Sequence, residues 1–183
     1  MSSQERIDEI VRFWFEELSP EDWYRKDSSI DAEIGARFGG IYDALKSHVS
    51  KDWLGTPQGY LAAILVLDQF PRNMFRDDPR AFATDAEALA LAKRAIAEGV
   101  DMRLPHDKRA FIYLPFQHSE DSADQARSIE LFTALGIPSN LDFALRHKAI
   151  IDRFGRFPHR NAVLGRVSTE EESDFLQQPG SSF

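Results

Sequence analysis

The residues from Phe154 to Asn161 form the densest group of potential ligand-binding side chains in the sequence. Two arginines, a histidine and an asparagine are interleaved with two phenylalanines, beside a glycine and a proline that set the backbone. A guanidinium group matches the two oxygens of a carboxylate or phosphate, and imidazole and amide groups supply further donors. The stretch therefore predicts a shaped loop that faces an anion, although it names neither the ligand nor a reaction.

Two further clusters have a similar make-up. One runs from Asp68 to Arg76 and the other is His118-Ser119-Glu120, and each lies at an expected helix end or break among phenylalanine and proline residues. If the helices alternate in direction, some of these ends share one side of the bundle and could converge. The residues expected to bind a ligand there are Asp68, Gln69, Arg72, Asn73, Arg156, His159, Arg160 and Asn161.

The first functional hypothesis is a binding module. An anionic small molecule or an acidic peptide segment would be bound by the arginines and oriented by the asparagines, and Trp14 or Phe157 would wall the pocket. The alternative for the arginines is that Asp68, Glu120 and Asp152 already occupy them in structural ion pairs.

Two other hypotheses stay open. The chain could be an enzyme with hydrolase-like chemistry, in which His118 or His147 acts as acid or base. Glu120 or Asp68 would orient the histidine, and the arginines would stabilise developing negative charge. It could instead be a scaffold that docks another protein in a helical groove, with the polar clusters purely architectural. An exposed apolar stripe would favour the scaffold.

Neither a metal nor a cofactor is expected. His118, Glu120, His147, His159 and Asp68 are possible ligands, but their spacing matches no metal motif, and nearby arginines raise the electrostatic cost of a cation. The sequence also contains no Gly-x-Ser-x-Gly elbow, no glycine-rich phosphate loop and no dinucleotide fingerprint.

Composition limits the class of protein further. The 183 residues, 43% of them hydrophobic, suffice for one domain with its own core, and the absence of cysteine excludes disulfides, thiolate zinc sites and a cysteine nucleophile. The net charge of −8 argues against nucleic-acid binding. Six of the seven charged side chains between residues 146 and 166 are basic, which suits an anionic ligand, an acidic partner or a balanced ion-pair network.

No targeting or membrane segment is apparent. The N-terminus lacks a basic head followed by an apolar run, and the longest apolar run, residues 61–67, is too short to cross a bilayer. A soluble cytoplasmic protein is expected, and its oligomeric state stays open.

Apolar residues at helical spacing predict the first half of the chain. A capping box of Ser2 and Glu5 starts a helix that ends at Ser19-Pro20. Ser28 or Ser29 caps a second helix, in which Gly39-Gly40 signals a close approach of another helix or a bend. Thr56-Pro57 starts a buried third helix, with the Asp68 to Arg76 cluster at its exit.

The second half continues in the same way. Helices are expected from Thr84 as N-cap to Glu98, over 106–118 despite Pro115, and over 124–135. Ser139 or Asn140 caps the next helix, and a capping box at 168–171 precedes a short acidic one. The prediction is a single all-α domain over residues 1–178, with roughly eight antiparallel helices and a frayed tail at 179–183.

The chain resembles the bacterial domain-of-unknown-function 924 family. The matching stretches are Phe13-Trp14-Phe15, Leu67 to Asn73, Tyr113 to Glu120 and Gly155 to Arg166. The resemblance implies an all-α fold similar to tetratricopeptide-like helical arrays, and it implies no settled activity. It places these residues at the family's signature positions: Asp68, Gln69, Arg72, Asn73, His118, Glu120, His147, Arg156, His159, Arg160 and Asn161.

Overall fold

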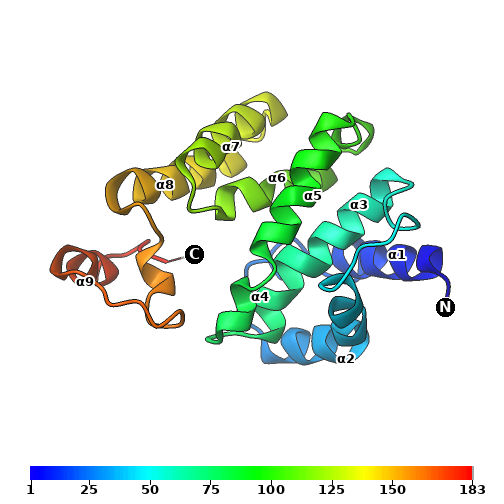
Figure 1. The fold of residues 1–183 in the computed structure, drawn as a ribbon, viewed down its shortest axis with the longest axis horizontal. Coiled ribbons are helices and arrows are strands. Elements are labelled where there is room, and N and C mark those ends of the chain that lie inside the picture. Colours follow the sequence, from blue (N-terminus) through cyan, green and yellow to red (C-terminus); the bar gives the residue numbers. More distant parts are fainter. Residues whose placement is uncertain (183) are drawn as a thin grey trace. The chain divides into compact units, whose positions relative to one another are not determined.

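The computed structural model describes residues 1–182, and within this range the chain is all-α, without a strand (Figure 1). The predicted all-α class is confirmed. The α-helices are α1 (Ser3–Arg12), α2 (Ser28–Leu45), α3 (Pro57–Ile64), α4 (Phe70–Met74), α5 (Asp85–Ala97), α6 (His106–His118), α7 (Ser122–Leu135), α8 (Pro138–Phe154) and α9 (Glu170–Leu176). Two π-helical turns (Phe13–Glu17 and Leu65–Gln69) and three 3₁₀ turns (Pro79–Phe82, Asp101–Arg103 and Pro158–Arg160) complete them.

Contacts divide the chain into two compact units. The N-terminal unit comprises Met1–Arg76 and Arg80–Pro115, and the C-terminal unit comprises Asp77–Pro79 and the chain from Phe116 onward. The boundary crosses α6, so its last turn belongs to the C-terminal unit. None of the helices in residues 1–182 is long and apolar enough to span a membrane.

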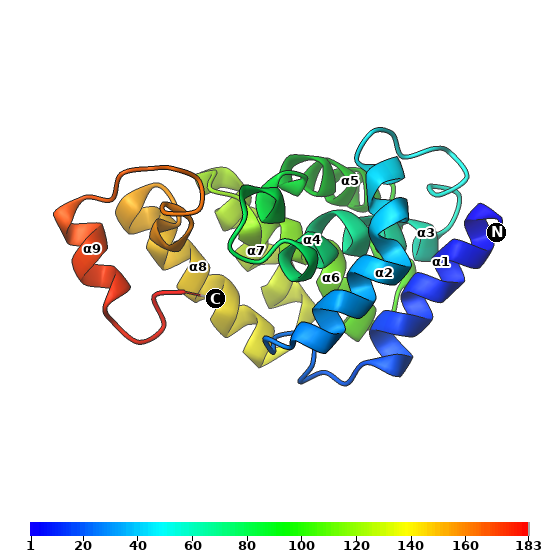
Figure 2. The same ribbon diagram turned by 90° about the horizontal axis from the view of Figure 1, so that it is seen from below.

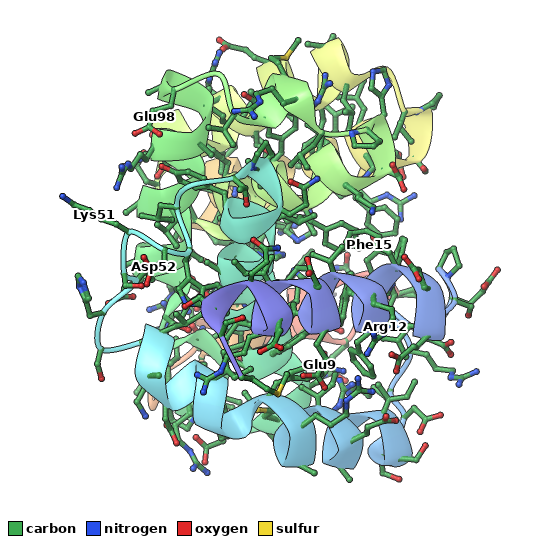
Figure 3. The ribbon with its side chains drawn as sticks, turned by 90° about the vertical axis from the view of Figure 1, so that its right-hand side faces the viewer. Glu9, Arg12, Phe15, Lys51, Asp52 and Glu98 are labelled. Carbon is green, nitrogen blue, oxygen red and sulfur yellow. The ribbon has the colours of Figure 1, made fainter. Side chains whose placement is uncertain are left out.

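In the N-terminal unit, α1 buries one face against its neighbours. The predicted capping box is confirmed, because Ser2 and Glu5 bond each other's backbone amides. The helix continues as a π-helical turn from Phe13, whose ring lies 5.1 Å from that of Phe38 in α2. Glu9 points from α1 toward α2 (Figure 3), where Arg37 donates to it.

The third helix begins at Thr56-Pro57 as predicted, but its end differs from the prediction. The Asp68 to Arg76 cluster does not follow the helix, since the chain continues through the π-helical turn into α4. Pro71 is the cause. It has no N–H for the carbonyl oxygen of Leu67, and the hydroxyl of Thr84 donates to that oxygen at 2.6 Å.

Several predicted helix starts are wrong by a few residues. Asp27 caps α2 in place of Ser28 or Ser29, because its carboxylate accepts two backbone amides. The predicted N-cap of α5, Thr84, is confirmed, although its hydroxyl makes no capping bond. Proline sets the start of α8: its N-cap is Ile137, and Pro138 supplies a first residue that needs no N–H partner, so neither Ser139 nor Asn140 caps it.

Gly39 and Gly40 do not mark a close approach of another helix. A Cβ atom built on either one meets no other atom within 4 Å, and α2 runs through both. The alternative of a bend stays a prediction.

In the C-terminal unit, α7 and α8 lie side by side (Figure 1). Gly136 and Gly155 end them with φ values of 76° and 69°, a conformation that favours glycine. The segment after α8 turns back beside the end of that helix and leads into α9 (Figure 2). The predicted capping box of α9 is shifted by one residue, to Thr169 and Glu172.

The predicted frayed tail, 179–183, is described as far as residue 182. Within it, Ser181 is buried and its hydroxyl donates to the carbonyl oxygen of Leu176. Phe183 lies outside the described residues.

Candidate functional site

The polar cluster from Asp68 to Arg76 is closed by carboxylates of its own N-terminal unit. Arg72 donates through Nη1 and Nη2 to Asp85 at 2.9 and 3.1 Å, and Nη1 also donates to the backbone oxygen of Asp68. Asp68 is fully buried, and its Oδ2 accepts from Gln69 at 2.5 Å. Burial disfavours the Arg72 cation, but Asp68 and Asp85 outweigh that effect and raise its pKa. Arg72 is thus held as a structural cation.

The remainder of this cluster is fixed by Asp31 of α2. Asn73 donates to Asp31 at 2.9 Å, and Arg76 donates to both of its carboxylate oxygens, at 2.5 and 2.9 Å. These bonds tie α4 to α2. The polar groups of the cluster therefore cross-link the helices of the N-terminal unit.

The cluster His118-Ser119-Glu120 and the stretch from Phe154 to Asn161 meet within the C-terminal unit. Glu120 accepts from the backbone N–H of Phe157 at 2.7 Å and from both terminal nitrogens of Arg166 at 2.8 and 3.0 Å. Arg160 donates to the backbone oxygen of His118 at 3.0 Å. The predicted convergence is confirmed for these two clusters. Their convergence with the Asp68 to Arg76 cluster stays a prediction.

Three side chains surround the ring of Phe157 and a fourth, His118, lies beside one of them. We call these five residues the Phe157 cluster: His118, His147, Phe157, His159 and Arg160. The rings of His147 and His159 lie 5.5 and 5.6 Å from that of Phe157, and the guanidinium carbon of Arg160 lies 4.7 Å from its centre. His118 lies 6.2 Å from His147, ring to ring. The cluster joins α6, α8 and the Pro158–Arg160 turn.

His147 is a neutral, anchored member of this cluster. Its Nδ1 lies 2.8 Å from the carbonyl oxygen of Phe143, so Nδ1 carries the proton and donates. Burial lowers its pKa to about 3, and electrostatic repulsion from His118, His159 and Arg160 lowers it further. A histidine with so low a pKa is poorly suited to acid–base catalysis at neutral pH.

Arg156 and Asn161 converge on Glu172 instead of on a ligand. Glu172, 2% exposed, accepts from Arg156 at 2.6 and 2.7 Å, from Asn161 at 3.3 Å and from the N–H of Thr169 at 2.8 Å. The Arg156 bond is the main cause of its low pKa of about 2. This carboxylate closes the turn between α8 and α9.

The basic island between residues 146 and 166 is matched residue by residue. Its members pair as Arg146–Asp142, Lys148–Asp152, Arg153–Glu171, Arg156–Glu172 and Arg166–Glu120, and Arg160 bonds the backbone of His118. A balanced internal network therefore describes the island well. The expected assignment of acids was partly wrong, because Glu120 pairs with Arg166 and Asp152 with Lys148.

The predicted pocket walls are core residues. Trp14 and Phe157 are 1% and 0% exposed, so both rings are packed in the core. Within residues 1–182, no three His, Asp or Glu side chains are grouped so that they could hold a metal ion. A shallow groove of about 510 Å³ lies between α7 and α8, lined by Ala126, Ile129, Leu145, Lys148, Ala149 and Asp152.

Comparison with known proteins identifies the family. The model for "Bacterial protein of unknown function (DUF924)" matches residues 10–180. The chain belongs to the DUF924 family. The structure of the protein of unknown function ATU0120 from Agrobacterium tumefaciens is similar, with a TM-score of 0.92 and 40% sequence identity, over 96% of this chain and 99% of that one. No curated protein matches the chain.

Sequence reasoning grouped the candidate residues into these clusters but missed their partners. Asp31, Asp85, Arg166 and Glu172 complete the networks, and none was expected to do so. Thr169 with Glu172 three residues later was the one available signal, because it is a second capping-box pattern beside the one proposed. Asp31 and Asp85 stand in the first turns of helices, where an acid needs no special explanation.

Proposed function

We propose that the C-terminal unit binds an anionic small molecule or an acidic peptide group at the Phe157 cluster. The supporting observation is the low pKa of His147, about 3, which burial causes first and to which electrostatic repulsion from His118, His159 and Arg160 contributes. A positive potential that helps to exclude a proton from one ring attracts an anion to the same place. Histidine and arginine donors are also the groups that bind carboxylate and phosphate oxygens.

The proposal assigns charge binding to Arg160 with His118 and His159. Arg72 and Arg156 each hold a carboxylate of their own unit through two hydrogen bonds. Arg72 is held in addition by the backbone oxygen of the buried Asp68, and Glu172 is only 2% exposed, so neither arginine is open to exchange with a ligand. Their proposed role is therefore to fix the helices that carry the site.

Acid–base catalysis receives less support than binding. Glu120, the proposed partner of His118, accepts from Arg166 and Phe157, and its pKa is lowered although burial acts in the opposite direction. A carboxylate that stays ionised has no proton to donate, and its lowered pKa makes it a poor base. Cytoplasmic localisation and a tetratricopeptide-like stacking of the helix pairs remain proposals, the second supported by the adjacent pair α7 and α8.

The test is calorimetric titration with inorganic phosphate and with succinate at low ionic strength. Arg160→Gln should weaken binding of the preferred anion at least tenfold, because one charged donor is lost. Arg146→Gln is the matched control, since Arg146 lies in the same unit, is exposed and pairs with Asp142. Equal binding by the wild type and Arg160→Gln would reject the proposal, and so would the absence of binding to any anion.

The groove between α7 and α8 supports a second candidate, self-association through this face. Leu145 is 49% exposed beside the small residues Ala126 and Ala149, so a projecting side chain and a hollow share one surface. A two-fold axis would place Leu145 of each copy in the hollow of the other, with the Lys148–Asp152 pairs at the rim. Light scattering should then show a dimer that Leu145→Arg dissociates and Leu164→Arg does not. A monomer at all concentrations would exclude it.

A further inference from the structure

Glu120 is held in a geometry that would suit any carboxylate. One oxygen accepts the backbone N–H of Phe157 at 2.7 Å, and both oxygens face the guanidinium fork of Arg166, at 2.8 and 3.0 Å. A two-pronged arginine and a backbone amide aimed at the same oxygen pair form a complete carboxylate receptor. Arg160 adds positive charge nearby, since it contributes to the low pKa of Glu120.

The donors of this receptor are arranged without help from Glu120. Arg166 also donates to the carbonyl oxygen of Phe157 at 3.1 Å, and its own N–H donates to the carbonyl oxygen of Asn161 at 2.8 Å. The turn that contains them is closed by Gly165, at a φ of 66°. The receptor is therefore built within residues 157–166, whereas its present occupant enters from the segment between α6 and α7.

The occupant is also accessible. The side chain of Glu120 is 29% exposed and that of Arg166 is 23% exposed, in contrast to Glu172, whose side chain is 3% exposed in the neighbouring network. Part of each side chain in the Glu120–Arg166 pair therefore faces solvent. A partly exposed pair contributes little net stability and can exchange partners at low cost.

We propose that Glu120 is an internal occupant of a carboxylate-binding site, and that the anion bound by the C-terminal unit is a carboxylate that displaces it. The inference rests on the proposed function and names its ligand class and its regulation. The carboxylate can belong to a free organic acid or to an acidic peptide, because both present the same two coplanar oxygens. With Glu120 in place, its carboxylate competes with the ligand for Arg166 and the Phe157 N–H.

Removing the internal occupant provides the test. Acetate, succinate, the tripeptide Gly-Gly-Glu and inorganic phosphate are titrated into ¹⁵N-labelled wild type and Glu120→Ala, and the amide signal of Phe157 is followed. Carboxylates should saturate that signal at concentrations at least tenfold lower in Glu120→Ala than in the wild type. Phosphate should bind the variant more weakly than acetate. Succinate and the tripeptide distinguish a free acid from a peptide as the preferred source.

Two further variants keep the result interpretable. Glu120→Gln retains an acceptor for the Phe157 N–H and guards against misfolding of the alanine variant, and it too should bind carboxylates more tightly. Glu171→Ala frees the exposed Arg153 and should leave the Phe157 signal unchanged. Unchanged carboxylate affinity in both Glu120 variants overturns this inference. In that case the proposed function still stands if the wild type binds an anion and Arg160→Gln binds it more weakly. Tighter binding of phosphate than acetate by Glu120→Ala also overturns it, and no binding of any anion by any form rejects both.

Discussion

The two compact units treat their buried polar groups differently. In the N-terminal unit the arginines of the signature cluster end on carboxylates: Arg72 on Asp85 and Arg76 on Asp31. In the C-terminal unit, buried side-chain atoms without a hydrogen-bond partner among residues 1–182 occur at Gln117, Gln125, Ser128, Asn161 and Arg166, whereas in the N-terminal unit such an atom occurs at Trp14. Each such atom costs about 1–3 kcal/mol relative to a bonded one.

This difference distinguishes polar groups that hold the fold together from polar groups that could bind a ligand. A closed network such as that of Arg72 stabilises the fold but leaves no donor for a ligand. Polar groups with spare hydrogen-bonding capacity lower stability and are retained where they serve another purpose, which is how a functional site differs from a core. The proposed anion site lies in the C-terminal unit, so substitutions in the two units should have different consequences.

The largest effect is expected from Glu172→Ala in the C-terminal unit. The substitution leaves the partly buried Arg156 without its carboxylate and Asn161 and Thr169 without their acceptor, and it should lower the free energy of unfolding by about 3 kcal/mol. Urea denaturation measures this loss. Hydrogen exchange should show the added opening in residues 156–176 and not in α3 or α4.

Glu171→Ala is the control for this prediction. Glu171 pairs with Arg153 on the surface, where its side chain is 62% exposed, so the loss should be at most about 0.5 kcal/mol. Equal losses in the two variants would mean that Glu172 is an ordinary surface acid.

Acid should destabilise the C-terminal unit through His147. Its pKa is about 3 in the fold and near 6.5 in an unfolded chain, so the unfolded state binds the proton as the pH falls below 6.5. The stabilisation is complete above that pH and is lost progressively toward pH 3. Between pH 7 and pH 5 the loss is about 2 kcal/mol.

The variant His147→Gln isolates this contribution. It keeps a donor for the carbonyl oxygen of Phe143 but cannot take up a proton in this range, so the pH dependence of unfolding should become shallower between pH 7 and 5. Identical slopes for the variant and the wild type would show that His147 is protonated in the fold. That outcome would also remove the support for a positive potential at the Phe157 cluster.

In the N-terminal unit, the bond from Thr84 to Leu67 should be worth about 1 kcal/mol. Thr84→Val leaves a buried carbonyl oxygen without a donor, because Pro71 cannot supply one. In a Pro71→Ala background the new N–H can serve that oxygen, so Thr84→Val should cost less there. A double-mutant cycle followed by urea denaturation measures the coupling, and additive losses would refute this account of the π-helical turn.

The elements with local signals were predictable from the sequence. Thr56-Pro57, Gly136 and the Ser2–Glu5 capping box each fix a helix end through bonds within a few residues, so composition and spacing reveal them. The π-helical turn before Pro71 was not predictable in this way. Its carbonyl partner, Thr84, is 17 residues distant from Leu67 along the chain, and nothing in either residue type requires the contact.

The candidate site divides along the same line. Residue type and clustering were enough to nominate His118, Arg160 and Asn161. They were not enough to show which arginines were already engaged, because Arg72–Asp85 and Arg166–Glu120 join residues 13 and 46 positions apart. The chemistry of a side chain is visible in the sequence, whereas its availability depends on partners that only the fold brings together.

The smallest effect, and the only gain in stability, is expected in α2 of the N-terminal unit. Gly39→Ala and Gly40→Ala add a Cβ that meets no other atom within 4 Å, and neither glycine has a positive φ. Each substitution should therefore raise the free energy of unfolding by about 0.5–1 kcal/mol, because alanine loses less backbone entropy than glycine in a helix. Thermal and urea denaturation measure the gain, and anion titration should be unaffected because the change lies outside the C-terminal unit. A loss of stability would mean that α2 bends at these glycines and that the backbone freedom is used.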